Sequence, residues 1–143
     1  MQRSHFRHWL AIPIRWGDMD ALKHVNNVQF FRYLESGRIA YFNEVLPPAC
    51  EPDRYTVLAD LQCAFRQQLH YPGTVDVGTR IHRLGSSSIH LHCAIFRQGD
   101  EQPAATARAV IVWYDFTQSR SIPLPAQVRQ TLLSFEGMPD ETS

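Results

Sequence analysis

The segment from Arg15 to Arg38 places several polar side chains directly before a run of apolar ones. Its candidate chemical groups are Asp18, Asp20, His24, Asn26 and Asn27. Carboxylates and imidazoles are common proton acceptors in enzymes, and a carboxylate can also attack a carbonyl carbon. These residue types at this spacing are therefore compatible with acyl-transfer or hydrolytic chemistry.

A long helix is predicted to begin at these polar residues, from about Asn26 to Leu46, where Pro47 and Pro48 would stop it. A helix N-terminus leaves about four N–H groups unpaired and carries a partial positive charge. Such donors stabilise a carbonyl oxygen that becomes negative during attack. One continuous stretch could thus supply both a base and an electrophilic stabiliser.

A purely structural interpretation of the same residues also exists. Asp and Asn are favoured at helix N-caps and in turns, so Asn26 or Asn27 could cap the helix while Asp18 and Asp20 shape the loop. Residue types alone favour this interpretation over the catalytic one.

The predicted helix carries a broad apolar face. Its members are Val28, Phe30, Phe31, Leu34, Ile39, Tyr41, Phe42 and Val45. Glu35 and Arg38 fall inside this apolar arc, and their spacing of three allows them to pair. A buried charge needs such a partner, so a structural ion pair and direct chemistry by Glu35 are the two alternatives.

The remainder of the chain predicts an antiparallel sheet. Residues 6–15 form a first strand, and runs with inward-facing apolar residues begin near Val57, Val75 and Ile89. A further run over residues 104–114 is fairly apolar on both faces, as expected of a central strand. Short Gly-containing turns favour hairpins, and a last helix is predicted over residues 125–135. The expected fold is α+β: one domain over residues 1–143, with a long central helix packed on a five-stranded antiparallel sheet.

One helix cannot cover both faces of such a sheet. The face left open is predicted to carry Leu58, Ala64, Val110 and Val112. We expect a second copy of the chain to bury part of this surface.

Composition excludes several classes of function. Lys plus Arg and Asp plus Glu both total 14, so the net charge is zero and the chain lacks the electrostatic signature of nucleic-acid or anionic-membrane binding. Cys50, Cys63 and Cys93 are scattered and odd in number, which indicates a reducing compartment rather than a disulfide framework. With no signal peptide or spanning segment in the sequence, we expect a cytoplasmic protein.

Two groups of basic side chains are further candidates. Candidates for binding phosphate groups are Arg66, Arg83, Arg97 and Arg120. His82, His90 and His92 could gather on two paired strands with His82 opposite His90. The gathered histidines would form either a zinc site or, as nearby Arg80 favours, a polar outer face or an assembly contact.

The motif residues resemble those of the 4-hydroxybenzoyl-CoA thioesterase-like acyl-CoA thioesterases, which have the hotdog fold. That family shows Asp-x-Asp, Gly-His-Val-Asn-Asn, an aromatic-rich helix and Glu-x-x-Arg. The corresponding segments here are Asp18–Asp20, His24–Asn27, Phe30–Tyr33 and Glu35–Arg38. The motif covers about one sixth of the chain, and the order of elements is similar to the hotdog fold over nearly all of it.

The resemblance implies an enzyme that hydrolyses an acyl-CoA thioester without a metal or organic cofactor. It implies Asp20 as nucleophile or general base, backbone N–H groups from Val25 to Asn27 on the thioester carbonyl, and His24 lining the pocket. Asp18, Glu35 and Arg38 would support the site. The family's assemblies imply a homodimer, often a dimer of dimers, with the active site between subunits.

Two positions depart from the family pattern. Lys23 stands where the family has glycine, which concerns the shape of the loop, and Phe30 stands where a tyrosine is common. Two alternatives share the fold: a non-catalytic acyl-binding or scaffold module, and a hydroxyacyl-thioester dehydratase that pairs His24 with Glu35.

Overall fold

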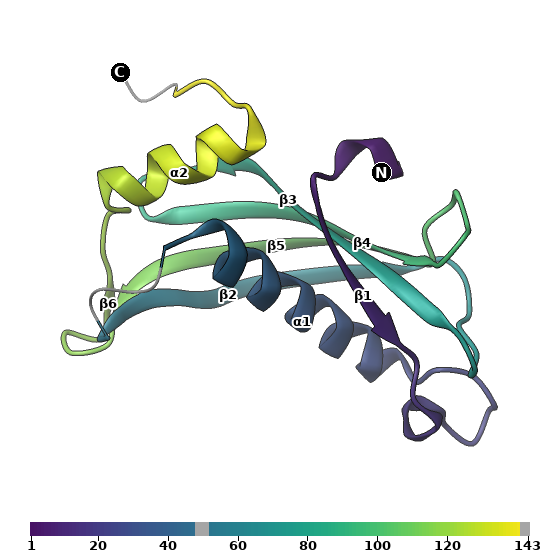
Figure 1. Ribbon diagram of the computed structural model, residues 1–143. Coiled ribbons are helices and arrows are strands. Elements are labelled where there is room, and N and C mark those ends of the chain that lie inside the picture. Colours follow the sequence, from purple (N-terminus) through teal and green to yellow (C-terminus); the bar gives the residue numbers. More distant parts are fainter. Residues whose placement is uncertain (48–51, 141–143) are drawn as a thin grey trace.

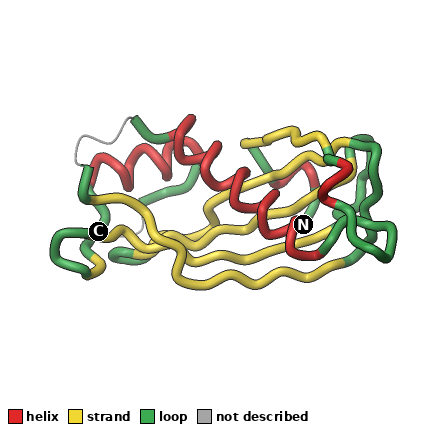
Figure 2. Tube along the Cα trace, turned by 90° about the horizontal axis from the view of Figure 1, so that it is seen from below, coloured by secondary structure: helices red, strands yellow, loops and turns green. Residues whose placement is uncertain are grey.

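The computed structural model describes residues 1–47 and 52–140. Its elements are η1 (Arg3–His5), β1 (His8–Pro13), η2 (Trp16–Asp18), α1 (Asn27–Val45), β2 (Arg54–Phe65), β3 (Thr74–Leu84), β4 (Ser88–Arg97), β5 (Ala105–Asp115), β6 (Arg120–Ser121) and α2 (Ala126–Glu136). The long helix α1 lies along one face of a curved antiparallel sheet (Figures 1 and 2). This confirms the predicted α+β hotdog architecture. Cys50 and Pro48 lie outside the described residues.

The sheet has the strand order β1-β3-β4-β5-β2, and the short β6 also pairs with β5. Strands β3, β4 and β5 form the predicted hairpins, and every pairing is antiparallel. The strand β2 does not pair with β3, which follows it, but lies beside β5. The connection over residues 66–73 is too long for a tight hairpin, and the N–H groups of Arg66 and Gln67 bind the carbonyl of Ala104 instead.

The helix α1 turns only part of its predicted apolar face into the core. Its buried residues are Phe30, Tyr33, Leu34, Gly37, Arg38, Tyr41 and Phe42. Val28, Phe31 and Ile39, which the prediction placed on the same face, are exposed. The helix packs closely at Gly37, where a Cβ atom would lie 2.6 Å from Val77 Cγ1. A bulkier residue at this point would push the helix away from β3.

A bulge in β2 changes which side chains face the helix. The register shifts between Leu58 and Asp60, so that Leu58 lies opposite the buried Ile111 and Leu61 lies opposite Ala109. Leu58 therefore lies on the helix side of the sheet, and its predicted place on the open face is wrong. The extra residue at the bulge interrupts the two-residue period from which that prediction was made.

The opposite face of the sheet is partly covered by the N-terminal segment. Phe6 and Trp9 pack against Ala94 and Phe96 at one end of this face. Elsewhere on this face, the predicted residues Val110 and Val112 are partly buried and Ala64 is exposed. Their burial by a second copy stays a prediction.

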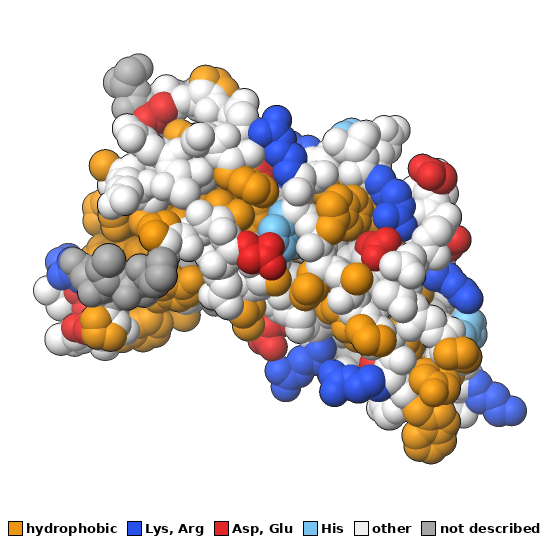
Figure 3. Space-filling view, viewed as in Figure 1, with side chains coloured by type: hydrophobic (Ala, Val, Ile, Leu, Met, Phe, Trp, Pro, Cys, Tyr) orange, Lys and Arg blue, Asp and Glu red, His pale blue; other side chains and the backbone are white. Residues whose placement is uncertain are grey.

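Exposed apolar side chains are instead concentrated along α1 and β2 and around the loop before α1. They are Trp16, Leu22, Val28, Phe31, Ile39, Leu58, Phe65 and Tyr71, together with Phe116. Figure 3 shows apolar side chains protruding at the lower right, over the loop before α1. The strand β2 is also the last in the sheet order, so its outer backbone edge pairs with no other described strand. Among the described helices, none combines the length and apolar character needed to cross a bilayer.

Candidate active site at the start of the long helix

The loop between η2 and α1 folds back on itself and brings the predicted site residues together. Met19 and Val25 form a bridge, and the N–H of Asp20 donates to the carbonyl of His24 at 3.0 Å. One pair further out, the N–H of Asn26 donates to the carbonyl of Asp18 at 3.0 Å. Asp20 and His24 are therefore neighbours at the tip of a closed loop that leads directly into α1.

Asp20 is partly buried, and only one of its two carboxylate oxygens accepts a hydrogen bond. Its Oδ1 accepts a hydrogen bond from the N–H of Leu22 at 2.8 Å, which is an Asx turn. In the described part of the chain, Oδ2 accepts no hydrogen bond. The loop therefore fixes the direction of the carboxylate while leaving one oxygen able to take a proton or to attack.

The amide groups that lead into α1 are not equally available. The N–H of Val25 donates to the carbonyl of Leu69 at 2.7 Å, and that of Asn26 is held by Asp18. The N–H of Val28 is capped by Asn26 Oδ1 at 3.0 Å, and Gln29 bonds the carbonyl of Asn26. Among residues 25–29, Asn27 alone has an N–H without an acceptor in the described part of the chain. The expectation that all three amides from Val25 to Asn27 face a substrate is thus wrong for the first two.

Asp18 serves the loop rather than an open site. It is 6% exposed, and its Oδ2 accepts from the hydroxyl of Tyr33 at 2.7 Å and from the N–H of Arg15 at 2.9 Å. Burial and this hydrogen bond both raise the pKa of Tyr33, so the hydroxyl stays protonated and remains the donor. The structural interpretation of the sequence therefore applies to Asp18.

Lys23 adopts a backbone conformation that glycine favours. Its φ is +68°, in the left-handed region, where a Cβ atom meets the following carbonyl oxygen. This explains in physical terms why a glycine suits the position. The loop keeps its closed shape here, since the N–H of Lys23 donates to the carbonyl of Asp20 at 3.1 Å.

Replacing Lys23 by glycine should relieve this strain. We expect Lys23→Gly to raise the free energy of unfolding by about 1 kcal/mol, which corresponds to about 3 °C in melting temperature for a chain of this size. Lys23→Ala removes the same charge but keeps the Cβ atom, so it should give no gain. Thermal unfolding of the two variants beside the wild type measures the difference, and equal melting temperatures would contradict the strain at this position.

A second histidine, which the sequence analysis did not single out, contacts the loop. A ring nitrogen of His70, Nδ1, lies 3.1 Å from the carbonyl oxygen of Lys23, and its ring lies 6.5 Å from that of His24, edge to face. The Nδ1 atom of His24 itself lies 3.3 Å from the carbonyl oxygen of Val25. His70 is far away in sequence, and only the pairing of residue 69 with residue 25 brings it here. No local signal could have found it.

Glu35 and Arg38 do not form the predicted ion pair and do not belong to this loop. Glu35 pairs with Arg32 at 2.9 Å, while Arg38 is 7% exposed and its Nη1 has no partner in the structure. Arg32 lies three residues before Glu35 and Arg38 three residues after, so spacing alone could not choose between them. His24 is held in the loop by hydrogen bonds, whereas Glu35 is paired with Arg32 on α1. The structure therefore gives no support to the dehydratase alternative, in which His24 and Glu35 would act together.

The three histidines of β3 and β4 do gather, but among positive charges. The rings of His82 and His92 stack at 4.0 Å, and that of His90 lies 6.1 Å from His82. A bulge after Ile81 places Arg83, not His82, opposite His90. Burial first, and then the neighbouring histidines and arginines, lower the pKa of these rings. Such a positive environment disfavours a dication, and no group of metal ligands occurs in residues 1–47 and 52–140.

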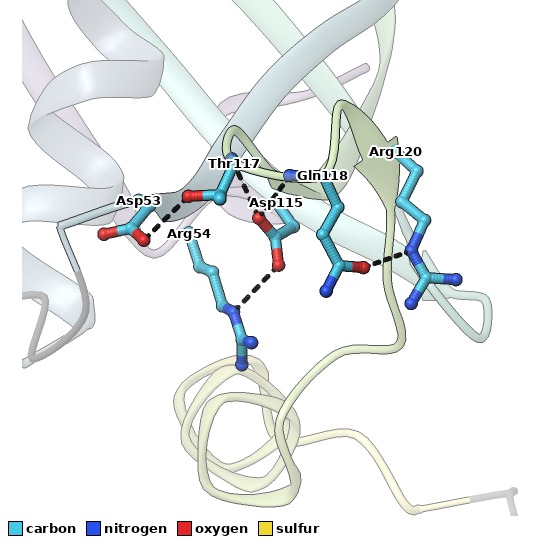
Figure 4. A network of polar contacts seen from close by, with 6 residues as sticks. All are labelled: Asp53, Arg54, Asp115, Thr117, Gln118 and Arg120. Carbon is cyan, nitrogen blue, oxygen red and sulfur yellow. Dashed lines mark hydrogen bonds and ion pairs between the residues drawn. The ribbon is translucent and has the colours of Figure 1, made fainter.

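The predicted phosphate-binding arginines lie in different parts of the sheet. Arg66 donates to Thr106 Oγ1 at 3.1 Å, and Arg83 Nη2 lies 3.0 Å from a ring nitrogen of His90. Arg120 donates to Gln118 Oε1 at 2.6 Å, next to a network that closes the β5–β6 turn (Figure 4). Arg97 is exposed. The structure does not bring the four together.

The turn in Figure 4 and the cysteines serve the fold. Backbone N–H groups of Gln118 and Thr117, and the Arg54 side chain, donate to Asp115. These donors hold the pKa of Asp115 below its ordinary value.

Cys93 is fully buried and Cys63 partly buried, and burial raises the pKa of both thiols, as expected for core residues.

Comparison with known proteins gives a consistent result. Residues 14–132 match the family model of the thioesterase-like superfamily. A thioesterase of Thermus thermophilus, solved in complex with coenzyme A and Zn, is 31% identical, with a TM-score of 0.83 over 94% of this chain and 98% of that one. The PA5185 protein of Pseudomonas aeruginosa PAO1 is 26% identical, with a TM-score of 0.85 over 94% of both chains. The uncharacterised protein YsmA of Bacillus subtilis is 25% identical over 92% of this chain and 88% of its own length.

Proposed function

Because this chain belongs to the thioesterase-like superfamily, we propose that it is an acyl-CoA thioesterase that acts through Asp20. The observation that carries the proposal is the Asp20 carboxylate, which keeps Oδ2 free of hydrogen bonds within a closed loop that leads into α1. The similar thioesterase crystallised with coenzyme A supports an acyl-CoA substrate. The products would be a free carboxylic acid and coenzyme A.

Asp20 has two possible roles in this reaction. As a general base it takes a proton from water while the water oxygen attacks the thioester carbon, after which the C–S bond breaks and the thiolate leaves. As a nucleophile its free oxygen forms a mixed anhydride and releases the thiolate, and water then hydrolyses the anhydride. The free Oδ2 is compatible with both roles.

The N–H of Asn27 is the donor we assign to the thioester oxygen. Asn27 is an exposed residue at the first position of α1, where the partial charges of the helix are positive. A donor fixed before the reaction stabilises the negative charge that develops on the oxygen during attack. His24, beside Asp20 in the loop, would contact the bound thioester from the other side.

A homodimer would complete this site. In the single chain, Leu22 and Trp16 beside the catalytic loop are 75% and 77% exposed, and the free edge of β2 lies beside the exposed apolar side chains of α1. A second copy that covers these surfaces would bury them and shield the thioester from water. A monomer mass in light scattering at assay concentration would contradict this arrangement.

The proposed activity is tested by the release of free thiol from acyl-CoA substrates with short, long and aromatic acyl groups, each offered also on acyl carrier protein. We expect release from at least one acyl-CoA at a rate well above spontaneous hydrolysis. Absence of thiol release across the whole panel would favour the non-catalytic module, which shares the fold but needs no reactive carboxylate.

A further inference from the structure

A cavity of about 230 Å³ lies between the second half of α1 and the strands β2 and β5. It is lined by apolar parts of Ile39, Phe42, Tyr55, Leu58 and Ile111, together with Glu35, Arg38, Asn43 and Thr56. At 1.5 Å per residue, Arg38 is about 16 Å along the helix from Asn27. Within one chain, the cavity is therefore separate from the loop that carries Asp20.

Arg38 is a buried cation without a hydrogen-bonded anion among the described residues, although the charge of Glu35 acts on it at longer range. It is 7% exposed, its Nη1 is sealed from solvent, and no oxygen of the residues that the structure describes accepts a hydrogen bond from its guanidinium. Burial lowers the pKa of Arg38, and the opposite effects of Cys93 and Glu35 offset only part of this. A buried charge without a partner is strongly unfavourable, so a negative group entering the cavity would be bound tightly.

The acid nearest in sequence is already engaged. Glu35 Oε1 accepts from Arg32 Nη1 at 2.9 Å, and its side chain is 46% exposed, so Glu35 lies at the rim of the cavity. The guanidinium of Arg38 can therefore donate to an incoming carboxylate without breaking an existing pair.

We propose that this cavity binds a small carboxylic acid, with its carboxylate on Arg38 and its apolar body against Phe42, Leu58 and Ile111. The apolar walls favour an organic anion over an inorganic one, which would lose its water without gaining partners on most sides. The volume is below the range of about 300–1,000 Å³ that holds drug-sized ligands, so the occupant is of the size of benzoate or hexanoate. A free acid is also the product class of the proposed reaction, but binding needs no turnover.

The test is isothermal titration of the wild-type protein and of Arg38→Met with benzoate and hexanoate, and with their neutral amides as shape-matched probes. We expect the wild type to bind at least one acid at least tenfold more tightly than its amide, because only the acid pairs with Arg38. Arg38→Met keeps the length and apolar character of the side chain and should lose this preference. Arg32→Met removes an exposed arginine of the same helix and should keep it.

Two further measurements keep the result decisive. Leu58→Trp fills the cavity without changing any charge and should also abolish acid binding, which covers the case in which Arg38→Met fails to fold. Sedimentation velocity of each variant shows whether self-association depends on Arg38. Equal affinity for acid and amide in the wild type would overturn the proposal. It would also be overturned if the wild type bound no acid and Arg38→Met lost the dimer, because Arg38 would then pair with a carboxylate of a second copy. Either result leaves the assignment of Asp20 intact.

Discussion

Asp20→Asn should lose nearly all acyl-CoA hydrolysis while the fold remains unchanged. A positioned base contributes about 10²–10⁴-fold to a rate, so we expect kcat to fall by at least about 100-fold. The amide oxygen of asparagine still accepts the hydrogen bond that Leu22 donates to Oδ1, so the loop keeps its turn. What is lost is the negative charge and the free oxygen that could take a proton or attack the thioester.

The measurement is steady-state thiol release at saturating substrate, with thermal unfolding of the same preparation. Glu101→Gln is a matched control, because it neutralises an exposed carboxylate in the turn between β4 and β5 and should retain full activity. An Asp20→Asn enzyme with more than about a tenth of wild-type kcat would remove Asp20 from the chemistry.

The sequence pattern predicted the elements well because periodicity is a local property. The long helix was expected from residue 26 to residue 46 and is α1, Asn27–Val45. The run from residue 104 to residue 114 became β5, Ala105–Asp115. The helix was predicted from its side-chain period, and the strand from its length and from two fairly apolar faces, which are typical of a central strand.

The errors arose where one residue changes the phase of a strand or where chemistry depends on distant partners. The bulges after Leu58 and Ile81 moved Leu58 to the helix side and placed Arg83 opposite His90. A bulge has no required residue type, so alternation cannot reveal it. Likewise, the contact of His70 with the loop depends on pairing across more than 40 residues.

Within the candidate site, the sequence identified the right loop but could not assign each residue its role. Asp18 and Asp20 are two residues apart and identical in type, yet one is sealed against Tyr33 and the other keeps a free oxygen. The difference comes from the turns on either side of the Met19–Val25 bridge, because Asp18 ends η2 whereas Asp20 begins the turn that contains Leu22. The catalytic role of Asp20 remains a prediction that the variants above test.

Asp18→Ala should therefore act on stability rather than on chemistry. The substitution leaves the buried hydroxyl of Tyr33 and the N–H of Arg15 without an acceptor. Leaving the buried Tyr33 hydroxyl unsatisfied costs about 1–3 kcal/mol, and losing the hydrogen bond of the more exposed Arg15 N–H costs about 1 kcal/mol. We therefore expect the free energy of unfolding to fall by about 2–4 kcal/mol in denaturant titrations. Tyr33→Phe removes one of the two bonds and leaves no orphaned donor, so it should cost only about 1 kcal/mol. If Asp18→Ala unfolded at the wild-type denaturant concentration, the loop would not depend on this carboxylate, and the separation of roles between the two aspartates would fail.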